Sequence, residues 1–276
     1  MSGPVTVHSM RKLIIGLLCL AGLAVVIDFG AAAYSEYRVS RSLREGADLS
    51  ADPEVTFHGF PFLRQAFNGR YDNIQITARS MRPDIPGEIA VEATLTGMRL
   101  PLGDLVDGRV RSVPVDRVDV RMRVEPVELG RLFGIPDLQV HSRPADKSDG
   151  TGGSGGSGMT TAGALVLTGT LPKAPTGQFG ATIAGERVSV QADLLLDGDQ
   201  IRVIATGFYR SPDDTSSVVV PEEDAPAVLA RFTRTIDTKE LPFGIRPTEV
   251  FALGGQIVVE GQGENVTIDL DRLRRQ

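Results

Sequence analysis

The strongest hydrophobic pattern in the chain is an apolar run near its start. In the segment Leu13–Ala33 only Asp28 carries a charge. As a helix this segment is about 31 Å long, close to the thickness of a bilayer core. Arg11 and Lys12 precede the run. A basic flank stays on the cytoplasmic side, so the chain after the run is predicted to lie outside the cytoplasm.

Two interpretations fit this apolar run. Residues 1–33 form a membrane anchor, or they form a cleaved signal peptide, because Leu13–Ile27 suits the apolar region of such a peptide and small residues follow at 31–33. Both interpretations place residues 40–276 outside the cytoplasm. A buried soluble helix is disfavoured because no polar face interrupts the run. The single cysteine, Cys19, excludes an internal disulfide and is expected to face lipid.

Helical patterns in the remaining chain are few and short. Residues 34–46 space apolar side chains as an amphipathic helix does, and this helix is predicted to end near Gly46. Further helices are predicted at 127–134 and 223–236. A fourth helix is predicted between Pro61, which fits a helix start, and Gly69, which can end a helix in a left-handed turn.

Most of the chain alternates between apolar and polar residues, which is the pattern of strands. The alternation is clear at 88–95 and 117–124, and at 187–208, where Asp197-Gly198 predicts the turn of a hairpin. Residues 254–270 predict another hairpin. One apolar and one polar face on each strand indicate an antiparallel sheet that is wet on one side.

The predicted helices are too few for a layered α/β fold. The fold class is therefore α+β, with a long, curved antiparallel sheet wrapped around helices. Residues 143–160 are rich in Gly and Ser and form a flexible linker by composition. Neither side of this linker has enough helix to cover its own strands. We therefore expect residues 34–276 to form a single domain after the N-terminal segment.

Composition removes several classes of function. The 276-residue chain has a net charge of −6 and a pI near 5.2, which argues against nucleic-acid binding. It has three His and no Trp. Matches to the G-x-S-x-G and G-x-G-x-x-G motifs at 150–156 lie in the Gly/Ser tract, without the strand and helix that either motif requires. We therefore predict no enzymatic activity, no cofactor and no metal site.

One stretch concentrates large apolar side chains without catalytic groups beside them. Residues 57–67 hold four of the eleven Phe of the chain. The candidate lipid-binding residues here are Phe57, Phe60, Phe62, Leu63 and Phe67, with Phe243 as the matching residue of a later Pro-Phe pair. Candidates for a phosphate headgroup are Arg64, Arg70 and Arg79. The cluster either closes a dry core, or lines a tunnel mouth or dips into a membrane.

Three short motifs carry a family resemblance. They are G-F-P-F-L at 59–63, N-G-R-Y at 68–71 and L-P-F-G at 241–244. Together they resemble the LmeA family of phospholipid-binding envelope proteins of actinobacteria, over about residues 30–270. The resemblance implies a protein that is not an enzyme, binds phospholipid and supports envelope glycolipid assembly. It also implies a tubular lipid-binding architecture akin to the bactericidal permeability-increasing proteins.

Two functions follow from these patterns. The first is a phospholipid-binding, possibly lipid-transferring, protein on the outer face of the cytoplasmic membrane that holds acyl chains in an apolar tunnel. Burial of each acyl CH₂ contributes about 0.8 kcal/mol to such binding. The second is a structural or partner-binding envelope protein with a dry core and no ligand. The inward-facing residues of a tunnel and of a packed core have the same pattern, so the sequence leaves both open.

Overall fold

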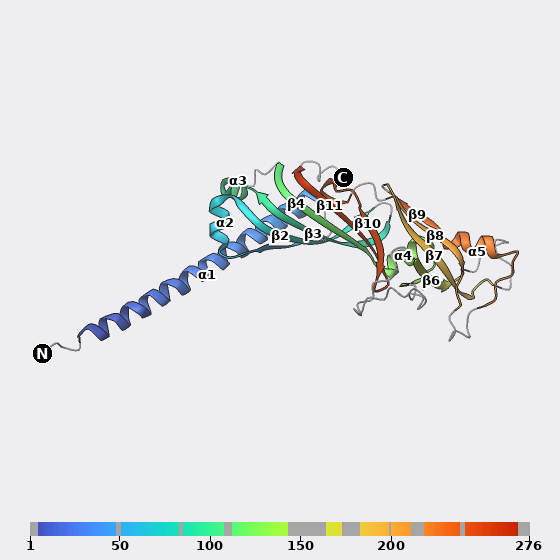
Figure 1. Ribbon diagram of the computed structural model, residues 1–276, viewed down its shortest axis with the longest axis horizontal. Coiled ribbons are helices and arrows are strands. Elements are labelled where there is room, and N and C mark those ends of the chain that lie inside the picture. The colour runs from blue at the N-terminus through green and yellow to red at the C-terminus, as the bar shows by residue number, and fades with distance from the viewer. Residues whose placement is uncertain are drawn as a thin grey trace, which may run out of the picture. The chain divides into compact units, whose positions relative to one another are not determined.

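The fold is that of a computed structural model, shown as a ribbon in Figure 1. The structure describes residues 5–47, 51–82, 85–107, 112–142, 164–172, 183–198, 200–210, 218–237 and 241–269. The Gly/Ser-rich segment at 143–160 and its two motif matches lie outside these residues. The described chain combines one long apolar helix, several short helices and two antiparallel sheets, which confirms the α+β class. The tubular architecture stays a prediction.

A single helix, α1 (Val5–Ala47), contains both the predicted apolar run and the predicted amphipathic helix. No proline interrupts it, and its end agrees with the prediction near Gly46. The side chains of 10–27 are exposed on every side, whereas a half-buried face begins at Asp28 and returns every three to four residues up to 43. By length and composition, α1 is able to cross a membrane. A signal sequence meets the same two criteria.

The short helices begin and end at the residues that their sequences indicate. Helix α2 (Phe62–Asn68) follows Pro61 and ends at Gly69, whose φ of 61° is left-handed, so this prediction is confirmed. The prediction at 127–134 is confirmed as α4 (Pro126–Phe133). Helix α3 (Leu102–Asp107) was not predicted.

The predicted helix at 223–236 is half wrong. Helix α5 covers Ala225–Arg231, and β9 (Arg234–Asp237) follows it. Residues 234–237 pair with the neighbouring strand β8, and Ile236 is buried there. Pairing with a strand distant in sequence therefore overrides the local helical pattern.

The first sheet has six strands in the order β1-β2-β3-β4-β11-β10. Its members are β1 (Glu54–His58), β2 (Arg70–Arg82), β3 (Ile85–Arg99), β4 (Ser112–Val124), β10 (Glu249–Leu253) and β11 (Gln256–Asp269). Strands β3 and β4 contain the predicted strands at 88–95 and 117–124. Along β4, buried and more exposed side chains alternate for most of its length, as expected for a sheet with one covered face.

The second sheet has five strands in the order β5-β6-β7-β8-β9. The strands not yet given are β5 (Gln139–Ser142), β6 (Ala164–Thr170), β7 (Arg187–Asp197) and β8 (Gln200–Phe208). Strands β7 and β8 are the predicted hairpin, with Gly198 at φ 59° in its turn.

The hairpin predicted at 254–270 is confirmed only in part. Residues 256–269 form one strand, and the hairpin turn lies before them at Gly254-Gly255, between β10 and β11. The Gly-rich appearance of this strand has a packing cause. A Cβ built at Gly261 would lie 2.5 Å from the carbonyl oxygen of Arg246. This glycine therefore allows two backbones to approach and does not mark a turn.

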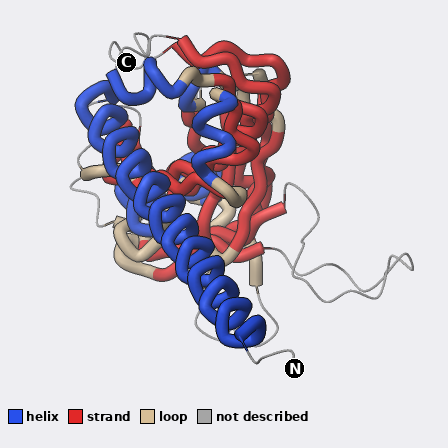
Figure 2. Tube along the Cα trace, turned by 90° about the vertical axis from the view of Figure 1, so that its left-hand side faces the viewer, coloured by secondary structure: helices blue, strands red, loops and turns tan. Residues whose placement is uncertain are grey.

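The chain divides into two compact units. The first comprises residues 1–77, 94–117 and 264–276, and the second comprises 78–93 and 118–263. In the first unit, helices α2 and α3 lie at the end of the sheet from which α1 extends (Figure 1), and α2 contacts both α1 and α3. Figure 2 shows the long helix running out past the strands. The expectation that residues 34–276 form a single domain stays a prediction.

Candidate functional site

The aromatic cluster at 57–67 has a buried part, which joins β1, α2 and β2. The ring of Phe62 lies edge-on to that of Phe57, with centroids 5.3 Å apart. The ring of Tyr71 lies 5.2 Å from Phe57 and 6.1 Å from Phe62. Phe62 is 3% exposed and Tyr71 is fully buried. The three rings therefore form the core of the first unit at this end, as the dry-core interpretation expects.

The hydroxyl group of Tyr71 has no hydrogen-bond partner among the described residues. Burial raises the pKa of Tyr71 to about 12, so the phenol remains protonated at neutral pH. A buried hydroxyl without a partner costs free energy, because it has lost its bonds to water. In the core around Phe57 and Phe62, the Tyr71 hydroxyl is thus a hydrogen-bond donor that finds no acceptor among the described residues.

The other aromatic residues of the cluster point out of the protein. Phe60 is 63% exposed and Phe67 is 75% exposed. Phe60 stacks on Phe29 of α1 with a centroid distance of 6.0 Å, and Phe29 is itself exposed. Leu63, which follows Phe62 in the sequence, is half-buried. The aromatic cluster at 57–67 thus divides into Phe57 and Phe62, which pack inside, and Phe60 and Phe67, which are both exposed.

Asp28, the one charge in the apolar run, connects α1 to this cluster. Its carboxylate accepts hydrogen bonds from the backbone N–H groups of Phe62 at 2.8 Å and Leu63 at 2.7 Å. These are the first residues of α2, whose N–H groups have no partner within the helix. Pro61, which precedes them, provides no side-chain cap. Asp28 therefore caps α2 from another helix and is itself only 5% exposed.

The same face of α1 continues along strand β1. Glu36 accepts a hydrogen bond from the backbone N–H of Phe57 at 2.9 Å, and the hydroxyl of Ser40 donates to the carbonyl of Pro53 at 2.6 Å. Positions 28, 36 and 40 lie two turns and one turn apart, on one side of the helix. From Asp28 onwards α1 is thus fixed to α2 and to the chain at 53–57, whereas its residues 10–27 are exposed.

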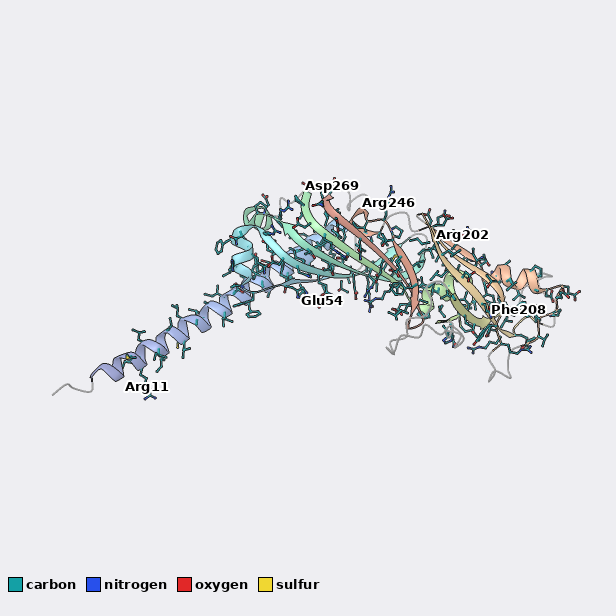
Figure 3. The ribbon with its side chains drawn as sticks, in the orientation of Figure 1. Arg11, Glu54, Arg202, Phe208, Arg246 and Asp269 are labelled. Carbon is teal, nitrogen blue, oxygen red and sulfur yellow. The ribbon has the colours of Figure 1, made fainter. Side chains whose placement is uncertain are left out.

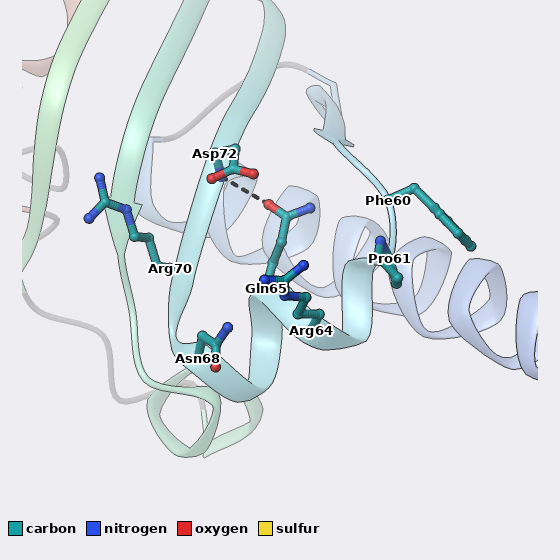
Figure 4. A pocket seen from close by; sticks show the side chains of 7 residues that line it. All are labelled: Phe60, Pro61, Arg64, Gln65, Asn68, Arg70 and Asp72. Atoms are coloured by element: carbon teal, nitrogen blue, oxygen red, sulfur yellow. Dashed lines mark hydrogen bonds between the residues drawn. The ribbon is translucent and has the colours of Figure 1, made fainter.

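A cavity of about 270 Å³ opens beside α2 (Figure 4). Phe60 and Pro61 line it from the loop before α2, α2 contributes three polar side chains, and β2 contributes two charged ones. In chain order these five are Arg64, Gln65, Asn68, Arg70 and Asp72. The volume is close to the lower limit for small-ligand pockets. It suits a polar headgroup better than a pair of acyl chains.

Gln65 fixes the back of this cavity. Its amide donates to the carbonyl of His58 at 3.2 Å and accepts from the backbone N–H of Asp72 at 2.9 Å. A Cβ added at Gly59 would lie 2.8 Å from the Gln65 amide nitrogen, and Gly59 has a φ of 100°. The glycine of the G-F-P-F-L motif thus leaves room for Gln65 to connect the loop with β2.

The two arginines of the cavity differ in their partners. Arg70 pairs with Asp116 at 3.0 Å, and Asp116 also pairs with Arg99. Arg64 is exposed and makes no ion pair with any residue that the structure describes. Asp72 opposes the two arginines at the cavity wall. The net charge of the lining is positive, and Arg64 is the cation that remains available to an anionic group.

Two sequence candidates lie elsewhere in the chain. Arg79, on β2, and Phe243, in a short 3₁₀ turn at Pro242–Gly244, both belong to the second unit. Phe243 is half-buried and has a φ of 65°, which is rare for a residue other than glycine. Neither residue lines the cavity at α2. Their lipid-binding roles stay predictions.

A sequence model of the LmeA-like phospholipid-binding family matches residues 26–262. The chain belongs to this family. The match begins two residues before Asp28, so it includes the capping contact, the aromatic cluster and the cavity at α2. The LmeA-like family is a binding family and not a catalytic one. No curated protein and no solved structure matches the chain.

Sequence reasoning missed Asp28 as a site residue and described it only as one charge in an apolar run. The signal was available, because a lone carboxylate inside an apolar helix requires a specific partner. The identity of that partner was not available, since the carboxylate reaches backbone groups 34 and 35 positions later. Gln65 and Asn68 were missed as well.

Proposed function

We propose that this protein binds phospholipid on the outer face of the cytoplasmic membrane, and that α1 anchors it there. The observation that carries the proposal is the coincidence of the LmeA-like match with a positively lined cavity next to an exposed aromatic surface. The phosphate of a lipid lies in the cavity, where it binds the guanidinium of Arg64, which pairs with no residue that the structure describes, and Arg70 adds a second positive charge.

The acyl chains leave this cavity on the side of Phe60. They are held by apolar surface, either in a tunnel that opens next to the aromatic core or in the membrane itself. The Tyr71 hydroxyl, which has no partner among the described residues, supports the binding of a lipid in the core. The ester oxygen of a lipid is an acceptor to which this hydroxyl would donate a hydrogen bond. Holding lipid outside the membrane plane would support envelope glycolipid assembly, by transfer or by presentation.

A second candidate function is a structural or partner-binding envelope protein without a ligand. The ring packing of Phe57, Phe62 and Tyr71 favours it, since these contacts are those of a closed core.

Lipid analysis of the full-length chain, purified in detergent, tests the proposal. Native mass spectrometry is expected to show a bound phospholipid that extraction then identifies. Binding of a fluorescent phospholipid is expected to weaken about 10- to 150-fold in Arg64→Ala, because a hydrogen bond to a charged group contributes about 1.5–3 kcal/mol.

Arg246→Ala is the matched control, since it removes the same charge from an exposed position that does not line the cavity and was not a candidate headgroup residue. It is expected to bind as the parent does. Equal losses of phospholipid binding in the two variants would show that Arg64 contributes only through its charge and not through a specific bond to the phosphate. A folded protein that neither retains nor binds phospholipid would support the ligand-free candidate.

A further inference from the structure

The exposed aromatic residues near Asp28 lie where α1 changes from an isolated helix to a packed one. The 18 residues Met10–Ile27 are exposed on all sides and, as a helix, extend about 27 Å. That length is close to the hydrocarbon thickness of a bilayer. Figure 3 shows Arg11 near the free end of this segment, far along α1 from the strands. From residue 10 onwards, the first buried residue of α1 is Asp28.

The hydrogen bonds of Asp28 fix the position of α2 along the axis of this apolar segment, and therefore its depth relative to a bilayer that covers the segment. The carboxylate is bonded to the start of α2, so Phe62 and Leu63 stay within one helical turn of the end of the apolar segment. Phe60 is stacked on Phe29, the residue after Asp28. A membrane that covers residues 10–27 therefore ends next to Phe29 and Phe60.

The exposed surface of α2 has the chemistry of a membrane interface. Arg64 and Phe67 are three positions apart and therefore neighbours on the helix surface, and both are exposed. Aromatic rings are enriched at headgroup level, and arginine beside them meets lipid phosphate. Phe60, at 63% exposed, and Phe67, at 75% exposed, would otherwise be left in water.

We infer that Phe29, Phe60 and Phe67 dock the first unit on the bilayer, with their rings in the interfacial layer of the leaflet that α1 leaves. Asp28 is the positioning residue, because its two hydrogen bonds hold α2 at this depth. The protein is then seated on the membrane surface and not suspended on a loose tether. The inference rests on the proposed membrane location, and it places the mouth of the α2 cavity at headgroup level.

The absence of tryptophan makes a direct measurement possible. Phe60→Trp and Phe67→Trp each introduce the only tryptophan into the full-length chain. Each protein is reconstituted into phosphatidylcholine vesicles with bromine at a shallow position of the acyl chains. Docking predicts a blue-shifted emission that falls at least twofold relative to vesicles without bromine.

Tyr37→Trp is the matched control. Tyr37 is also an exposed aromatic residue of the first unit, but it lies nine residues beyond Asp28 along α1, or about 13 Å. It is expected to show little quenching. Quenching at positions 60 and 67 that does not exceed the value at position 37 would overturn the docking.

A second arm separates docking from the binding of one lipid in the cavity. In detergent micelles that contain about one brominated lipid per protein, docking predicts that the quenching disappears. Quenching that persists there comes from a bound lipid and removes the support for docking. Vesicle quenching in a protein that retains no phospholipid on purification upholds docking while the proposed ligand function fails.

The role of Asp28 is measured in the same system. In Phe67→Trp protein, the further change Asp28→Ala leaves the two N–H groups of α2 without their acceptor, and quenching is expected to fall toward the Tyr37→Trp value. Asp28→Asn keeps an acceptor oxygen and should retain more of the quenching. Unchanged quenching in Asp28→Ala would remove Asp28 from the docking mechanism.

Discussion

Within the aromatic cluster at 57–67, phenylalanines close together in the sequence have opposite environments. Phe62 is buried against Phe57 and Tyr71, whereas Phe67, one turn later on the same helix, is 75% exposed. Burial of a ring stabilises the fold, and an exposed ring contributes little to folding and remains available for contacts with lipid. Buried and exposed aromatic side chains thus stand five positions apart on one short helix.

Truncation of these two residues should therefore have different results. Phe62→Ala is expected to lower the free energy of unfolding by about 3–5 kcal/mol, because it leaves a cavity in the core. Phe67→Ala is expected to change it by less than about 0.5 kcal/mol, as surface substitutions do. Denaturant unfolding of the full-length chain in detergent measures both values. Similar losses in both variants would contradict the separation of the two environments.

The buried hydroxyl of Tyr71 predicts that the free energy of unfolding falls at alkaline pH. Its pKa in the folded protein, about 12, is above the unfolded value of 10.0, so the folded state keeps its proton longer. The associated stability is present below pH 10 and is lost as the pH rises toward 12. Tyr71→Phe should remove this alkaline loss and leave stability at pH 7 equal or higher, because the hydroxyl has no partner in the described chain.

Thermal unfolding between pH 7 and 11 compares the parent and Tyr71→Phe. A variant that is less stable at pH 7 would show that the hydroxyl is in fact bonded. Weaker phospholipid binding in a variant of unimpaired stability would identify that partner as the lipid.

At the scale of elements, close backbone approach determines where the glycines of β11 are needed. Gly261 lies against the loop before β10, and an added Cβ would meet the Arg246 carbonyl oxygen at 2.5 Å and side-chain carbons of Leu241 and Ile245 at 2.8 and 2.9 Å. Residues 256–269 form one strand, and the glycine at 261 leaves room for this contact. The glycine of β8 at position 207 has no atom within 4 Å of its Cβ position.

Two glycine substitutions compare these elements. Gly261→Ala is expected to destabilise the protein by about 1–3 kcal/mol, because the backbone that it meets cannot rotate away. Gly207→Ala is expected to be neutral or to stabilise by about 0.4–1 kcal/mol, since alanine has less freedom in the unfolded chain. Melting curves of the two variants provide the comparison. A Gly261→Ala protein as stable as Gly207→Ala would show that the loop before β10 moves away from the added methyl group at little cost in free energy.

At the scale of the whole molecule, both sheets are built from the two sides of the Gly/Ser-rich segment. In the six-stranded sheet β4 neighbours β11, and in the five-stranded sheet β5 pairs with β6. The chain before 143 supplies β1 to β5, and the chain after 163 supplies β6 to β11. Neither portion completes a sheet alone, so we expect the two portions to stay together when the connection between them is cut.

Cleavage at a protease site inserted near residue 152 is therefore expected to leave the two fragments associated. Size-exclusion chromatography in detergent should show them in one peak, and heating should melt them in one transition. The uncleaved protein with the same insertion is the control. Fragments that separate under native conditions and melt independently would show two domains.

The sequence by itself determined the features that depend on local pattern. The apolar run, the strands at 88–95 and 117–124, and the β7–β8 hairpin follow from periodicity and turn residues. Helix α2 follows from Pro61 and Gly69, which fix backbone angles through their own covalent structure. The family motifs likewise lie within short segments.

Only the tertiary structure decided the features that depend on distant partners. It made residues 234–237 a strand through pairing with β8, and it placed Asp28 at the start of α2. It also separated the buried Phe62 from the exposed Phe60 and Phe67. In each case the free energy comes from contacts between segments far apart in the chain. Local composition is the same whether such a contact forms or not, so the sequence pattern carries no record of it.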